Sequence, residues 1–97
     1  MALKRKSMFG LEIELFTIDT EGRLANGADE IFKAAEGKKM AKYLKPEYSK
    51  SMVELCAKEN RSVRDCADAF MENLEDLVEL AEKTGYRLLP WAAIPAG

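Results

Sequence analysis

Residues 9–16 read Phe-Gly-Leu-Glu-Ile-Glu-Leu-Phe, an alternation of acidic and apolar residues that is typical of a β-strand. Successive side chains of a strand point to opposite faces, so Glu12 and Glu14 share one face. The apolar side chains fill the other face: Phe9, Leu11, Ile13 and Leu15. We expect this strand to run from Met8 to Ile18, with one face in the core and two carboxylates on the other.

The spacing of Glu12 and Glu14 has two interpretations. Their Cα atoms are expected to lie about 6.6 Å apart along the strand, which lets the side chains converge on one or two divalent cations. Alternatively, both acids line the solvated face of an antiparallel strand. On the spacing alone, we favour the solvated face.

Composition narrows the chemistry that the chain can perform. With 97 residues, 47% of them apolar, the whole chain (1–97) is expected to form a single domain with a real core. Lys and Arg number 15 against 17 Asp and Glu, so we expect no nucleic-acid partner. The chain has no histidine, which excludes Ser-His-Asp and Cys-His nucleophiles and the usual zinc ligand sets. Chemistry in this chain is therefore expected to be carboxylate chemistry.

Cysteine usage and hydropathy predict the compartment. Cys56 and Cys66 fit neither a disulfide framework nor a metal knuckle, and no secretory signal precedes them. No stretch approaches the roughly 20 apolar residues that cross a bilayer. We expect a cytoplasmic protein with no membrane segment.

The rest of the chain predicts two helices and two further strands. Turns are expected at residues 19–22 and at 26–27, with 23–25 either a returning edge strand or a loop. Asp29 is expected to cap a short helix that ends at Ala35, before Gly37. A second strand is expected from Glu47 to Cys56. An apolar strand follows Gly85 and continues to the end of the chain.

The clearest predicted helix runs from Ser62 to Thr84, with Ser62 and Asp65 as a variant capping box and Gly85 as the stop. Its expected buried stripe is Val63, Ala67, Phe70, Leu74, Leu77 and Ala81. Its expected solvent face is Asp68, Glu72, Glu75, Asp76, Glu79 and Glu82. The element order, strand-helix-strand-helix-strand, predicts an α+β fold in which helices cover one face of a mainly antiparallel sheet.

The second predicted strand carries further acids. Glu54 lies on the face opposite Val53 and Leu55, so three carboxylates share a face if the two strands lie in one sheet. Oxygen ligands of this kind select Mg²⁺ or Mn²⁺ over zinc or copper. Glu47 is seven residues from Glu54, which sends it to the opposite face of an unbroken strand unless Pro46 or a bulge resets the alternation. The sequence therefore leaves open whether Glu47 belongs to the site.

Three segments carry a resemblance to a known family: residues 9–16, then Lys-Pro-Glu (45–47) leading to Ser-Met-Val-Glu-Leu (51–55), then the long helix and the strand after Gly85. Together they resemble the amino-terminal part of the glutamate-cysteine ligase type of ATP-dependent carboxylate-amine ligases, relatives of glutamine synthetase. The resemblance implies a piece of a glutamine synthetase-like catalytic domain. It implies that Glu12, Glu14 and Glu54, with Glu47 a few residues upstream, bind the Mg²⁺ or Mn²⁺ that holds the phosphates of ATP. It assigns no catalytic residue beyond these metal ligands.

The implied reaction transfers the γ-phosphoryl group of ATP to a glutamate-like carboxylate, and an amine then attacks the acyl phosphate. Family members are considerably longer, and the apolar ending of this chain predicts that a longer protein continues beyond it. We therefore expect the chain to be inactive alone, with an open sheet edge after Ala93 that favours a homo-oligomer or pairing with another chain. Two alternatives remain: a non-catalytic α+β interaction or oligomerisation domain, and a stand-alone metal-dependent phosphate-handling protein.

Overall fold

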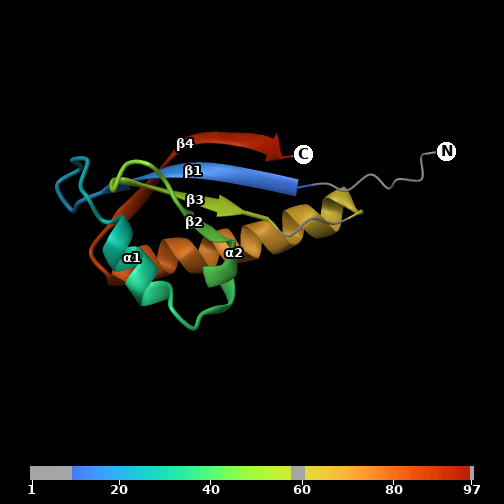
Figure 1. Cartoon of the computed structure of the whole chain (residues 1–97), viewed down its shortest axis with the longest axis horizontal. Coiled ribbons are helices and arrows are strands. Elements are labelled where there is room, and N and C mark those ends of the chain that lie inside the picture. Colours follow the sequence, from blue (N-terminus) through green and yellow to red (C-terminus); the bar gives the residue numbers. More distant parts are fainter. Residues whose placement is uncertain (1–9, 58–60, 97) are drawn as a thin grey trace.

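The fold is built on a four-stranded antiparallel sheet with strand order β2-β3-β1-β4. The computed structural model describes residues 10–57 and 61–96, and the side chains of these up to Trp91. The strands are β1 (Gly10–Ile18), β2 (Leu44–Pro46), β3 (Met52–Cys56) and β4 (Arg87–Ala96). The helices α1 (Ala28–Ala35), η2 (Lys39–Tyr43) and α2 (Val63–Lys83) lie on one side of the sheet (Figure 1). The predicted α+β class, with helices on one face of an antiparallel sheet, is confirmed.

Strand β1 is central and has the predicted alternation. Ile13, Leu15 and Thr17 are buried against the helices, whereas Glu12 and Glu14 are half-buried on the other face. The buried Thr17 hydroxyl donates a hydrogen bond to the Ala25 carbonyl and accepts one from a backbone amide in the following loop, so its polar atom is satisfied. The predicted first residues of the strand, Met8 and Phe9, lie outside the described residues.

The segment after β1 forms a turn, a loop and the first helix. Asp19 Oδ1 accepts hydrogen bonds from the backbone amides of Glu21 and Arg23, each 2.9 Å long, and Gly22 has a φ of +83°. Residues 23–25 are a loop with one isolated bridge, between Ile18 and Leu24. The predicted turn therefore forms, and no regular edge strand follows it.

The predicted cap of α1 is wrong. Gly27, not Asp29, is the N-cap, and Asp29 lies in the first turn with its carboxylate 3.1 Å from the ammonium group of Lys50. The physical reason is that the Gly27 carbonyl accepts a hydrogen bond from the Ile31 amide at 3.1 Å, while the Ala28 amide, which has no partner within the helix, donates to the Lys50 carbonyl at 3.0 Å. The ring of Tyr86 packs so closely on Gly27 that a Cβ there would lie 2.8 Å from ring carbons, so glycine suits this cap position. The predicted end at Ala35 is confirmed.

The region from Lys39 to Cys56 differs most from the prediction. The sequence predicts one strand from Glu47 to Cys56, but the chain forms a hairpin of β2 and β3 instead. The turn between them is stabilised by Ser49, whose hydroxyl accepts a 3.1 Å hydrogen bond from the Ser51 amide. Strand β2 contains Pro46, which has no backbone N–H to donate to a neighbouring strand. The proline is tolerated because β2 lies at the edge of the sheet.

Helix α2 begins and ends as predicted. The hydroxyl of the N-cap Ser62 accepts a hydrogen bond from the Asp65 amide at 3.2 Å, and Gly85 follows the helix with a φ of +95°. The predicted solvent face is exposed. Of the predicted stripe, Phe70, Leu77 and Ala81 are buried and Ala67 and Leu74 half-buried; the other buried residues are Cys66, Asn73 and Leu80.

The prediction that Val63 is buried is wrong, because 58% of its surface is exposed. Figure 1 shows the first turn of α2 extending beyond the ends of the strands, where no sheet lies beneath it. The contact with the sheet therefore begins one turn later, at Cys66.

The core lies between the sheet and the helices. Its fully buried large side chains include Leu15, Ile31, Val53, Leu55 and Leu77. Within the described segments, no helix is long and apolar enough to span a bilayer. Strands β2 and β4 form the two edges of the sheet, and pairing with another chain through β4 stays a prediction.

Candidate functional site

The acids lie on the face of the sheet that points away from the helices. Because Val53 and Leu55 are fully buried against the core, the alternation of β3 turns Met52, Glu54 and Cys56 toward the other side, where all three are half-buried. Glu12 and Glu14 of β1 share this side. We call this surface the open face.

The strand register places charged residues in rows across the open face. Lys45 of β2 pairs with Glu54 of β3, and Glu54 pairs with Glu14 of β1. In the next row Cys56 pairs with Glu12. Residues paired in this way have Cβ atoms about 4.5–5.5 Å apart, and diagonal neighbours such as Glu12 and Glu54 are within reach of long side chains.

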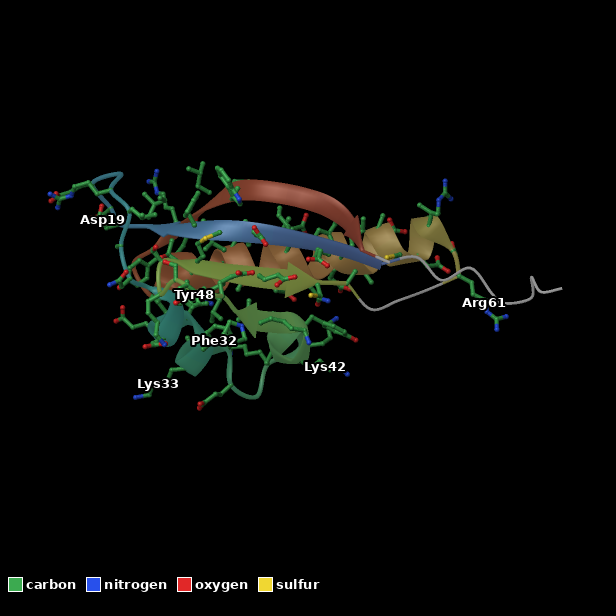
Figure 2. The ribbon with its side chains drawn as sticks, turned by 45° about the horizontal axis from the view of Figure 1, so that its top comes forward. Asp19, Phe32, Lys33, Lys42, Tyr48 and Arg61 are labelled. Atoms are coloured by element: carbon green, nitrogen blue, oxygen red, sulfur yellow. The ribbon has the colours of Figure 1, made fainter. Side chains whose placement is uncertain are left out.

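Glu54 is the centre of the acidic cluster. Its pKa is raised to about 7, first by burial and then by hydrogen bonding with Glu12 and Glu47 and by the negative charge of Glu12. Glu47 reaches Glu54 because it lies in the loop after β2, where the alternation of a strand does not apply. The same loop carries Tyr48, whose side chain is fully exposed (Figure 2).

The structure therefore brings Glu12 and Glu47 to Glu54 and places Glu14 opposite Glu54 in the register. As the described residues stand, no three histidine, cysteine or acidic side chains are positioned to hold a metal ion. The carboxylates meet Glu54 from different sides and do not form a finished ligand cage.

The donor set nevertheless fits a hard cation. It consists of carboxylate oxygens, which Mg²⁺ and Mn²⁺ prefer, and the raised pKa of Glu54 shows that its negative charge lacks compensation on this half-buried surface. Lys45 supplies one positive charge beside Glu54, but Lys45 is exposed to solvent. A bound cation would lower the cost of ionising Glu54.

Cys56 is part of the same cluster without being reactive. Its thiol donates a 3.6 Å hydrogen bond to Glu54 Oε2. Burial, followed by the charge of Glu54, raises the pKa of this thiol to about 11, so it stays protonated at neutral pH. Cys56 therefore orients a carboxylate and is a poor nucleophile.

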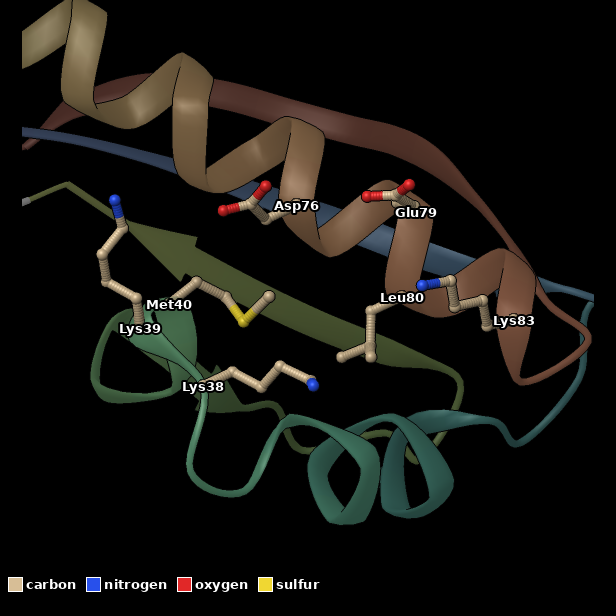
Figure 3. A pocket seen from close by; sticks show the side chains of 7 residues that line it. All are labelled: Lys38, Lys39, Met40, Asp76, Glu79, Leu80 and Lys83. Atoms are coloured by element: carbon tan, nitrogen blue, oxygen red, sulfur yellow. The ribbon is translucent and has the colours of Figure 1, made fainter.

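A separate cavity of about 190 Å³ lies in the helical layer. Figure 3 shows that lysines from the start of η2 face acidic side chains of α2 across it. It is lined by Lys38, Lys39, Met40, Asp76, Glu79, Leu80 and Lys83. Charges of both signs compensate one another there, and the cavity is on the opposite side of the sheet from the carboxylates. We assign it no chemistry.

Sequence reasoning missed two features of the open face. Lys45 joins the cluster through β2, a three-residue strand with no periodic signal. Phe16 and Trp91 form an edge-to-face aromatic pair, with ring centroids 5.6 Å apart, next to the acids. Only the register of β4 reveals this pair, because the two residues are 75 positions apart in the sequence.

Comparison with known families gives a match that extends over almost the whole chain. The family model described as glutamate-cysteine ligase family 2 matches residues 8–96. Among curated proteins and among solved structures, no match was found. The matched region contains all four candidate carboxylates and all four strands.

Proposed function

This chain belongs to glutamate-cysteine ligase family 2 and is thereby related to the carboxylate-amine ligases, and we propose that it supplies the metal- and ATP-binding sheet of such an enzyme. The observation that carries the proposal is the meeting of Glu12 and Glu47 with Glu54 on the open face. Three carboxylates from two strands and a loop are kept together there although their mutual repulsion is unfavourable.

In this proposal Glu12, Glu14, Glu47 and Glu54 hold Mg²⁺ or Mn²⁺. When bound, such a cation neutralises negative charge on the phosphate oxygens of ATP. The chain's own residues prepare the site. Partial burial desolvates the Glu54 carboxylate, and the Cys56 thiol orients Glu54 Oε2 through a hydrogen bond. Lys45 partly balances Glu54 when the cation is absent.

The proposed reaction is ligation of a glutamate-like carboxylate to an amine. The carboxylate attacks the γ-phosphorus of ATP and ADP leaves; the amine then attacks the acyl phosphate, and inorganic phosphate leaves as the amide forms. Among the described residues of the open face, Lys45 is the basic side chain near the acids, which is little positive charge for a triphosphate. We therefore propose that turnover needs further basic groups from outside this chain. We also propose that the enzyme is cytoplasmic.

Binding of Mn²⁺ in place of Mg²⁺ tests the site directly. The free aquo ion has an electron paramagnetic resonance signal that disappears on binding, so the number and affinity of sites follow from a titration. We expect one or two saturable sites, and we expect E12Q and E54Q each to weaken binding about tenfold or more, since each removes a charged oxygen ligand. Mg²⁺ should compete for the same sites.

The matched control is E75Q, which removes one carboxylate from the exposed face of α2 and leaves the open face intact. If wild-type binding is weak and equal to that of E12Q, E54Q and E75Q, the proposal is wrong. The chain would then be an α+β domain that has kept the ligase scaffold without its metal site.

A further inference from the structure

An irregularity in the pairing of β1 and β4 determines the position of Trp91. Leu15 pairs with Pro90 and Glu14 pairs with Ala92, so Trp91 is an extra residue without a partner on β1. Such a β-bulge re-aims the side chain of the inserted residue, and bulges are over-represented beside active sites. Here the bulge places the Trp91 ring against Phe16, at 5.6 Å between centroids and 64° between ring planes.

The result is an apolar ledge on the open face, defined by Phe16, Met52, Leu89 and Trp91. Phe16 pairs with both Met52 and Leu89, so these side chains lie in one row of the sheet. Two side chains of the ledge are exposed although they are large and apolar: Trp91 is 63% exposed and Leu89 is 53% exposed. Single exposed apolar residues are common, but a row of them with an aromatic pair is typical of a binding surface.

The ledge lies beside the carboxylates. On β1, Phe16 follows Glu14 by two residues on the same face; on β3, Met52 precedes Glu54 by two. A step of two residues along a strand is about 6.8 Å. A ligand that lies along these strands therefore meets acidic residues at one end and a flat apolar surface at the other.

We propose that the ledge binds the base of ATP, with the base stacked on the exposed face of the Trp91 indole. This inference rests on the proposed function, because the carboxylates must first attract the phosphates through a divalent cation. Strand β1 lies between Glu54 on β3 and Trp91 on β4, so these two strands are about 9–10 Å apart, which leaves room for the ribose between the phosphates and the base. A purine has the broad π-face that an exposed indole favours, and the aromatic contact with Phe16 fixes the position of that indole.

Other occupants fit the ledge less well. A glutamate-like substrate is small and charged at both ends, so it gains little from an apolar surface. A second copy of the chain would need about 800 Å² of complementary surface per partner, and the neighbouring carboxylates would face those of the other copy. The base of a nucleotide needs only the ledge itself.

Trp91 is the only tryptophan of the chain, so its fluorescence reports directly on the ledge. We would titrate the 97-residue protein with MgATP, with magnesium tripolyphosphate, which has the phosphates and no base, and with glutamate. We expect MgATP alone to quench Trp91. We expect MgATP to bind about 5- to 150-fold more tightly than tripolyphosphate, which corresponds to about 1–3 kcal/mol of stacking.

Variants of Trp91 test whether the difference in affinity between MgATP and magnesium tripolyphosphate comes from the indole. By calorimetry, W91A should bind MgATP as weakly as it binds magnesium tripolyphosphate, W91F should keep most of the preference, and the control L24A should keep all of it. Leu24 is exposed like Trp91 but lies in the loop after β1. Because the Trp91 side chain is largely exposed, W91A is expected to fold.

The inference is overturned if tripolyphosphate binds as tightly as MgATP, if W91A keeps the preference, or if glutamate quenches Trp91 and MgATP does not. In those cases the proposed function survives as long as E54Q weakens the binding of magnesium tripolyphosphate about tenfold or more. If neither phosphate compound binds and the Mn²⁺ titration also shows no site, the proposed function itself has failed, and the inference with it.

Discussion

Replacement of Glu54 by glutamine should make the metal-free protein more stable at alkaline pH. The pKa of Glu54 is about 7 in the folded chain, against an ordinary value of 4.5. Between these values the unfolded chain has released the proton that the folded chain keeps. The unfolded state therefore binds fewer protons, and the stability of wild-type protein falls as pH rises from 4.5 to 7.

The size of the effect follows from the shift. A difference of 2.5 pH units corresponds to about 3.4 kcal/mol at most. Because Glu54 is only half-buried, solvent screening reduces this to about 1–2 kcal/mol. Glutamine has the same shape and no charge, and its amide donates hydrogen bonds to Glu12 or Glu47. The E54Q variant should therefore gain about 1–2 kcal/mol at pH 8 and very little at pH 4.5.

Urea unfolding with a metal chelator, at pH 4.5 and at pH 8, measures this difference. The control E75Q lies on the exposed face of α2 and should change stability by less than about 0.5 kcal/mol at either pH. Millimolar Mg²⁺ should then stabilise wild type at pH 8 and leave E54Q nearly unchanged, because a ligand stabilises the state that binds it. An E54Q protein no more stable than wild type at pH 8 would refute the crowding of carboxylates on the open face.

Three further changes test the packing by thermal or urea unfolding. G27A should cost about 1–3 kcal/mol, because the added Cβ would lie 2.8 Å from the Tyr86 ring; a neutral result would show that the ring moves freely. S62A should cost about 1 kcal/mol through loss of the hydrogen bond from the Asp65 amide, and S62D should restore most of it. N73L should stabilise by about 1 kcal/mol, since Asn73 is buried and its Oδ1 has no hydrogen-bond partner; a loss of stability would indicate that the larger side chain does not fit.

The elements predicted correctly are those in which local chemistry and burial agree. Strand β1 alternates apolar and acidic residues, so its two faces could be assigned without knowing its neighbours. Helix α2 has a capping serine at one end and a glycine at the other, and both signals act within one turn of the helix. Glu12, Glu14 and Glu54 could therefore be placed on one face from the sequence.

The errors share a different cause. Strand β2 is three residues long and exists because β3 offers it hydrogen bonds, so no pattern within residues 44–46 predicts it. The start of α1 depends on the carbonyl of Lys50, which accepts the Ala28 amide and is 22 positions away in the sequence. The exposure of Val63 depends on where the sheet ends beneath α2. In each case the deciding partner is distant in the chain.

The candidate site divides in the same way. Alternation along β1 and β3 already places three carboxylates on a common face, because a side-chain period of two is a local property of an extended backbone. Their approach to one another is set by hydrogen bonds between strands and by a loop: the register pairs Glu14 with Glu54, and the turn after β2 returns Glu47 to the same place. The bulge that aims Trp91 at Phe16 likewise arises only when β4 pairs with β1, since an inserted residue is defined by the strand beside it.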